Sequence, residues 1–135
     1  MIRFTSTVPV LRVTDFARSI AWYQNILGFS ADTSLAEAPN ASVLLARDDA
    51  RLMLRGGKVA AVRPLTGQDW DVYLRLDGGS LGELLDHARR RTPLVRGPEL
   101  MPTGLVEFEL EDPDGYRICI AELLPDTTGF PRAID

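Results

Sequence analysis

The sequence predicts an α+β fold made of two copies of one module, in which a strand and a helix precede three further strands. Three observations predict it: short apolar runs alternate with two helical segments, this order occurs twice, and a segment with glycine, proline and little periodicity separates the two occurrences. We expect one domain over 1–135, with a first βαβββ module at 7–56, a linker at 57–68, a second module at 69–123 and a tail at 124–135.

The first module opens with TVPVLRV at 7–13, a valine-rich apolar run typical of a strand. Thr14 and Asp15 then offer a helix N-cap, and apolar side chains follow at helical spacing from Phe16 onward. Gly28 is suited to end this helix because glycine adopts the left-handed conformation without a Cβ clash. The remaining strands of the module are expected at 29–35, 41–47 and 51–55, with Asp48-Asp49 as the turn between the last two.

The second module repeats the order. Its expected elements are a strand at 70–76, a helix that begins after Ser80, and strands at 93–96, 105–111 and 116–122. Ser80 and Glu83 have the spacing of a capping box, in which each side chain bonds the backbone of the other residue. The segment LVEFELE alternates strictly, so its glutamates lie on the opposite face from Phe108. DPDG at 112–115 predicts a type I turn between the last two strands.

The composition narrows the function classes. Hydrophobic residues make up 45% of the chain and charged residues 25%, which is typical of a globular protein with a core. The net charge of −4 argues against general binding to nucleic acids or anionic membranes, and we expect neither as a partner. Cys119 is the single cysteine, so no intrachain disulfide can form. With no signal-peptide pattern and no membrane-length apolar segment, the expected location is the cytoplasm.

Two segments carry a resemblance to a known family. The segment at 8–29 joins an apolar strand, an aspartate cap, a helix with the pair Trp22-Tyr23, and Leu-Gly-Phe; the segment at 108–122 holds DPDG between two strands. Together they resemble the vicinal oxygen chelate superfamily, the glyoxalase, bleomycin resistance and extradiol dioxygenase group, over about residues 7–123. The resemblance implies the glyoxalase/bleomycin-resistance fold, with curved mixed sheets around a concave cavity, and a homodimer.

In enzymes of that superfamily, about four side chains hold one divalent metal ion, which two substrate oxygens chelate. The resemblance places these ligand positions at Val8, near Met53, at or near Asp71, and at Cys119. Valine has no donor atom and a thioether is a poor ligand for a hard ion, so two of the four positions cannot serve. We therefore expect no metal and no cofactor.

Strand alternation predicts which side chains share a face with those positions, and hence line the cavity. Trp70 and Tyr73 would supply stacking surfaces and the arginines bidentate donors, in a hydrated groove where the charges are paired or wet. The same features also suit a solvated sheet face, an interface tryptophan and a small buried thiol at Cys119, and no residue is assigned a catalytic role. The candidate ligand-binding residues are Arg12, Arg55, Trp70, Tyr73, Arg75, Glu107, Glu109, Arg117 and Cys119.

The functional prediction is a metal-independent protein that binds and sequesters a small molecule, such as an antibiotic or another natural product, in the manner of the bleomycin-resistance members. The alternative is a metal-dependent enzyme of glyoxalase, lyase or dioxygenase type, with a displaced site built from Glu107, Glu109 or Asp69. A third hypothesis is a protein that retains the fold and acts mainly through dimeric interactions.

Overall fold

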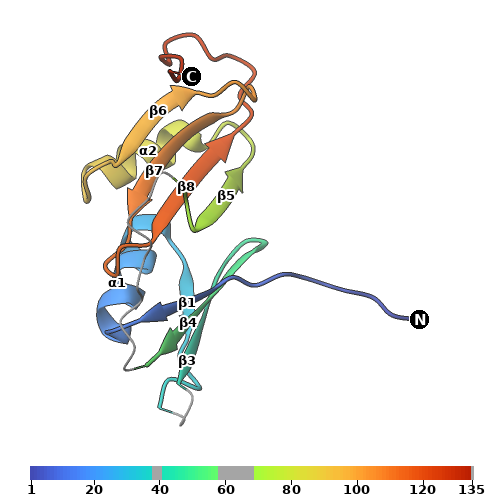
Figure 1. The fold of residues 1–135 in the computed structure, drawn as a ribbon, viewed down its shortest axis with the longest axis vertical. Coiled ribbons are helices and arrows are strands. Elements are labelled where there is room, and N and C mark those ends of the chain that lie inside the picture. The colour runs from blue at the N-terminus through green and yellow to red at the C-terminus, as the bar shows by residue number, and fades with distance from the viewer. Residues whose placement is uncertain (38–40, 58–68, 135) are drawn as a thin grey trace. The chain divides into compact units, whose positions relative to one another are not determined.

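The computed structural model of the chain describes residues 1–37, 41–57 and 69–134, and its two compact units are Met1–Val62 and Arg63–Asp135. Each unit has the order strand, helix, three strands and holds one four-stranded mixed sheet, so the predicted α+β fold with two βαβββ modules is confirmed (Figure 1). The predicted linker falls mostly on 58–68, outside the described residues. A cavity shared by the two sheets stays a prediction.

The first unit contains β1 (Val10–Val13), α1 (Phe16–Leu27), β2 (Ser30–Asp32), β3 (Ser42–Arg47) and β4 (Ala50–Gly56). Its sheet has the order β1-β4-β3-β2, in which β1 runs parallel to β4 and the other neighbours are antiparallel. The predicted helix ends are confirmed: the Asp15 carboxylate accepts from the Arg18 backbone N–H at 3.1 Å, and Gly28 has φ 70°. β2 stops earlier than predicted, since the Asp32 carboxylate accepts from the Ser34 N–H and starts a turn.

The second unit contains β5 (Val72–Leu76), α2 (Leu81–Arg89), β6 (Arg96–Leu100), β7 (Val106–Glu111) and β8 (Arg117–Glu122). Its sheet has the order β5-β8-β7-β6, with β5 parallel to β8 and the other pairs antiparallel. Phe108, Leu110, Ile118 and Ile120 are almost fully buried in its core. Neither helix of the described residues is long and apolar enough to cross a membrane.

The sixth strand differs from its predicted position at 93–96. β6 begins at Arg96, which pairs with Glu109, and continues through Gly97-Pro98 to Leu100. Proline lacks a donor, but it is tolerated here because β6 is the last strand in the sheet order and its register shifts between Arg96 and Glu99. The C-terminal tail then runs beside its end, where the Leu100 N–H donates to Pro131 O at 2.7 Å.

The predicted capping box at Ser80 is wrong. Ser80 makes no side-chain bond to the start of α2; its hydroxyl donates instead to Asp77 O at 2.8 Å. The cap comes from Glu122 at the end of β8, whose carboxylate accepts from the Gly79 N–H at 2.5 Å and the Leu81 N–H at 2.8 Å. A buried carboxylate among the free amides at a helix start is stabilised by both hydrogen bonds and the helix dipole.

Gly97, the glycine of β6, is tightly constrained. Its φ is 81°, and a Cβ there would collide with the backbone carbonyl oxygen of Glu107 on β7. We expect Gly97→Ala to lower the free energy of unfolding by about 3 kcal/mol, because backbone strain and a clash with a main-chain atom add. Urea denaturation should show a smaller loss, about 1 kcal/mol, for Gly78→Ala, where φ is 69° but no described atom lies within 4 Å of the added Cβ. Equal losses would contradict the clash.

Candidate functional site

The candidate site lies on the face of the second sheet that points away from α2. Glu122 bonds the start of α2, and Ile118 and Ile120 share its side of β8 by alternation, so Cys119 points to the opposite face. The register places Tyr73 on β5 and Glu109 on β7 on either side of Cys119. The predicted candidates Tyr73, Glu107, Glu109 and Cys119 are therefore neighbours on one face, as the alternation indicated.

Arg96, on the edge strand β6, connects the acidic side chains of this face. Its Nε donates to Glu109 at 3.0 Å, its Nη1 to Glu99 at 2.7 Å, and its Nη2 to Glu107 at 3.0 Å. Weaker contacts to sulfur complete the set, from Nη1 to Met101 Sδ at 3.5 Å and from Nη2 to Cys119 Sγ at 3.6 Å. All five N–H donors of the guanidinium thus have an acceptor.

Because Glu107 and Glu109 pair with Arg96, this face is more buried than predicted. Glu107 and Glu109 are only 3% and 4% exposed, whereas we expected glutamates in an open, hydrated groove. They tolerate burial because each accepts a charged hydrogen bond from the same guanidinium, which offsets part of their combined charge. Burial alone would lower the pKa of Arg96, but its hydrogen bonds to Glu99, Glu107 and Glu109 outweigh this and raise that pKa, so the guanidinium stays charged.

Tyr73 connects the Glu107 carboxylate to the indole of Trp70. Its hydroxyl donates to the second carboxylate oxygen of Glu107 at 2.7 Å. Its ring lies 5.2 Å, centroid to centroid, from Trp70, with 40° between the planes, and Trp70 is 41% exposed. Burial, and then the hydrogen bond and charge of Glu107, raise the pKa of Tyr73 above its ordinary range, so the hydroxyl remains a donor. The face thus offers an exposed indole next to a fixed hydrogen-bonded phenol.

Cys119 is a small buried thiol, as predicted, and is fully covered. Its Sγ lies 3.5 Å from Glu107 Oε1, and burial, followed by the negative charge of Glu107, raises the pKa of the thiol to about 12. A neutral thiol is a poor nucleophile and a poor metal ligand. The environment of Cys119 therefore opposes a covalent role.

The raised thiol pKa predicts a pH dependence of stability. Between the ordinary value of 9.0 and about 12, the unfolded chain loses the Cys119 proton while the folded chain keeps it, so stability falls as pH rises through this window. Urea unfolding at pH 7.5 and pH 10.5 should show a larger loss for the native sequence than for Cys119→Ala. The raised pKa of Tyr73 also lowers stability at high pH, in the native protein and in Cys119→Ala alike, so it does not account for the difference between them. A loss unchanged by Cys119→Ala would contradict the assignment.

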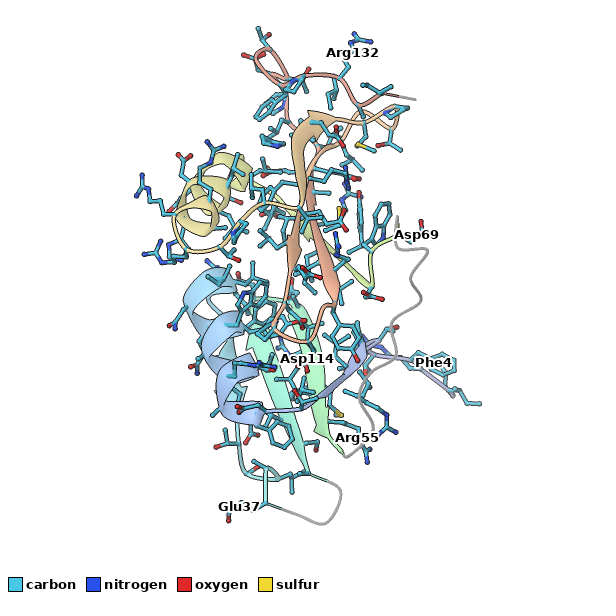
Figure 2. All side chains as sticks on the ribbon, turned by 60° about the vertical axis from the view of Figure 1, so that its left-hand side comes forward. Phe4, Glu37, Arg55, Asp69, Asp114 and Arg132 are labelled. Atoms are coloured by element: carbon cyan, nitrogen blue, oxygen red, sulfur yellow. The ribbon has the colours of Figure 1, made fainter. Side chains whose placement is uncertain are left out.

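The predicted arginines are distributed over both units. Arg12 and Arg55 are direct neighbours in the register of β1 and β4 in the first unit, and Figure 2 labels Arg55 near the end of β4. In the second unit, Arg75 is exposed on β5, and Arg117 on β8 lies 3.7 Å from the Glu111 carboxylate. Within the second unit, Arg96 makes the carboxylate contacts with Glu107 and Glu109 that we expected from the predicted arginines.

Sequence reasoning missed Arg96, Glu99 and Met101. The signal was present in the alternation of β7: two glutamates on one face require a cation from a neighbouring strand. Placing the strand at 93–96 ended it at Arg96 and left Glu99 in a loop, so the cross-strand partners of Glu107 and Glu109 could not be recognised.

The residues at the family's metal positions do not fit a metal ion. Val8 offers no donor, and Met53 offers only a thioether. The Asp71 carboxylate accepts from the Arg117 backbone N–H at 2.8 Å, and Cys119 is held as a neutral thiol. Within the described parts of the chain, no three His, Cys, Asp or Glu side chains are placed to hold an ion. At the displaced site that the sequence suggested, the Glu107 and Glu109 carboxylates already bind the Arg96 guanidinium.

A separate hollow of about 420 Å³ opens at the end of β5, beside the start of α2. Its walls include Gly78, Gly79 and the capping residue Glu122. The Glu122 carboxylate already accepts from the free amides at the start of α2, and the lining of the hollow includes neither Trp70 nor Tyr73.

The protein-family model of the Glyoxalase/Bleomycin resistance protein/Dioxygenase superfamily matches the sequence over residues 4–120, so the chain belongs to this superfamily. A bleomycin-binding protein crystallised with bleomycin is similar in structure, with a TM-score of 0.67 and 24% identity over 88% of this chain and 98% of that chain. No curated protein matches the sequence.

Two other solved structures show the range of proteins with this fold. A virulence protein from Salmonella typhimurium has a TM-score of 0.62 and 24% identity, over 92% of this chain and 100% of that one. A glyoxalase-related enzyme from Clostridium phytofermentans has a TM-score of 0.65 and 15% identity, over 91% and 98%. At these identities the likeness establishes the fold, and the function depends on the site.

Proposed function

We propose that this protein binds and sequesters a small molecule without a metal ion, using the face of the second sheet around Trp70 and Tyr73. The observation that carries the proposal is the aromatic pair joined to Glu107: an exposed indole beside a phenol held at 2.7 Å from a buried carboxylate. Such a surface suits a planar ligand that stacks on Trp70 and donates hydrogen bonds to the oxygen atoms of Tyr73 and Glu107. We infer that the ligand is an antibiotic or another natural product with these features.

The charge of the cluster around Arg96 favours a cationic ligand, because Arg75, the other cation that acts on Tyr73, is exposed to solvent. Three carboxylates, those of Glu99, Glu107 and Glu109, surround the single guanidinium of Arg96. A ligand cation near the aromatic pair would be attracted by this excess of negative charge and would also make a cation–π contact with the indole. Bleomycin, the ligand of the structurally similar binding protein, is therefore the first probe to use.

The proposal includes a homodimer in the cytoplasm. Apolar side chains that a monomer would leave in water support the dimer, among them Phe4 at 94% exposure and Leu35 at 58%. Sedimentation equilibrium measures the state directly: a single species at twice the chain mass is expected, and a monomer at micromolar concentration would contradict this part.

The test is a fluorescence titration of Trp22→Phe, which leaves Trp70 as the single tryptophan. Bleomycin and other cationic aromatic natural products are added, and saturable quenching is expected. In calorimetry, Trp70→Ala should weaken binding about tenfold, the effect of one stacking contact. Glu107→Gln keeps the shape and removes the charge, so it should weaken a cationic ligand more than a neutral one. Ligands that bind Trp70→Ala as tightly as the native sequence would place the site elsewhere.

A further inference from the structure

The acidic face around β7 contains a cation that belongs to the chain itself. Arg96 contacts Glu99, Glu107 and Glu109 with three different nitrogens, at 2.7 to 3.0 Å. Glu107 and Glu109 are two residues apart on β7, Glu99 is paired with Glu107, and Cys119 is paired with Glu109. Four side chains of metal-ligand type thus come from three adjacent strands, and a guanidinium lies among them.

We propose that Arg96 is a built-in replacement for a divalent cation, and that its guanidinium keeps a free metal ion off this face. The inference rests on the proposed function only in locating the ligand on the same face. Arg96 neutralises carboxylates and orients the side chains of the face, as a metal ion would otherwise do. The proposal also predicts how the face changes when Arg96 is removed.

Geometry explains the exclusion. A guanidinium is a planar fork that spreads its acceptors over separate nitrogens, whereas a metal ion draws its ligands to one centre. While Arg96 is present, the carboxylates are held apart, which agrees with the lack of any group of metal-ligating side chains gathered in the described residues. An ion that approached would also meet a fixed positive charge, since the guanidinium stays protonated.

Arg96 also orients the ligand face through Glu107. The Glu107 oxygen that accepts from Arg96 leaves the other oxygen to accept from Tyr73, whose ring contacts Trp70. The order of contacts is therefore Arg96, Glu107, Tyr73, Trp70. A single cation fixed to β6 holds this arrangement without any exchangeable ion.

Removing the guanidinium should convert the face into a metal site. In Arg96→Ala, the flexible side chains of Glu107 and Glu109 are free to converge, with the Cys119 thiol between them. Carboxylates and a thiol suit Zn²⁺, and binding would release the thiol proton because a coordinating sulfur is deprotonated. The affinity gained should then depend on Glu107 and Glu109.

The test measures Zn²⁺ and Mn²⁺ bound to the full chain after dialysis, together with the melting temperature in each metal and in EDTA. The native protein and Arg96→Lys should retain no ion and show no metal-dependent shift. Arg96→Ala should retain about one Zn²⁺ per chain and melt higher in Zn²⁺ than in EDTA, with an affinity at least tenfold above that of the native protein. Adding Glu107→Gln and Glu109→Gln to Arg96→Ala should abolish the gain.

Arg96→Met with Glu99→Gln is the second variant, since it removes the cation and one excess carboxylate together and so leaves less uncompensated charge than Arg96→Ala. It keeps Glu107, Glu109 and Cys119, and the same Zn²⁺-dependent stabilisation is expected, in refolding from urea if not in the native state. The proposal is overturned if the native protein holds the ion as tightly as the Arg96 variants, or if neither variant gains metal. A failed ligand titration with these metal results intact would instead count against the proposed function alone.

Discussion

Replacing Arg96 with alanine is expected to lower the free energy of unfolding in EDTA by about 3 kcal/mol. The substitution leaves the buried carboxylates of Glu107 and Glu109 without their guanidinium, and an uncompensated buried charge typically costs 3–5 kcal/mol. The lower end applies because the Arg96 side chain is itself 26% exposed and water can enter. Urea denaturation followed by circular dichroism measures the loss.

Two further variants show whether geometry or charge is responsible. Arg96→Lys keeps the charge but cannot reach three carboxylates from one fork, so it should recover only part of the loss. Glu99→Gln removes the most exposed of the three carboxylates, at 23%, and should cost less than about 1 kcal/mol. A native-like stability for Arg96→Ala would mean that Glu107 and Glu109 do not need the guanidinium.

Glu122→Ala is expected to lower the free energy of unfolding by a similar amount, about 3 kcal/mol. The residue is 2% exposed, and its two oxygens are the acceptors for the Gly79 and Leu81 amides at the start of α2. Each hydrogen bond to a charged group contributes about 1.5–3 kcal/mol, and the substitution leaves the buried Leu81 donor unsatisfied while water can reach the exposed Gly79. For a chain of this length, the melting temperature should fall by about 10 °C.

The matched control is Ser80→Ala. A serine that capped α2 through its side chain would cost about 1 kcal/mol when removed. Ser80 bonds Asp77 instead, so we expect a loss below about 0.5 kcal/mol. A larger loss for Ser80→Ala than for Glu122→Ala would restore the capping box that the sequence suggested.

The contrast between Ser80 and Glu122 shows what local sequence patterns can predict. Asp15 and Gly28 sit next to the helix that they delimit, so their roles were recognisable from neighbouring residues alone. Glu122 lies 41 residues after Leu81, and only the parallel pairing of β5 with β8 brings it to the helix start. The sequence therefore displays the local pattern of Ser80 and Glu83 but not the long-range cap by Glu122.

The candidate site was predictable to a similar extent. Alternation alone placed Tyr73, Glu107, Glu109 and Cys119 on one face, because a period of two fixes the face of each strand residue. It could not identify Arg96 as their partner, because that pairing depends on a strand that contains Gly97-Pro98 and shifts register between Arg96 and Glu99. Irregular edge strands of this kind have no simple periodicity to detect.

The measurement that tests the central claim most directly is a calorimetric titration of the native protein with bleomycin and a panel of cationic aromatic natural products, performed in EDTA and again in Zn²⁺. The recovered ligand is analysed by mass spectrometry. We predict saturable binding with the same Kd in both conditions and a ligand of unchanged mass. Binding that requires the metal, or a ligand that returns chemically altered, would contradict a metal-independent binding protein and favour an enzyme.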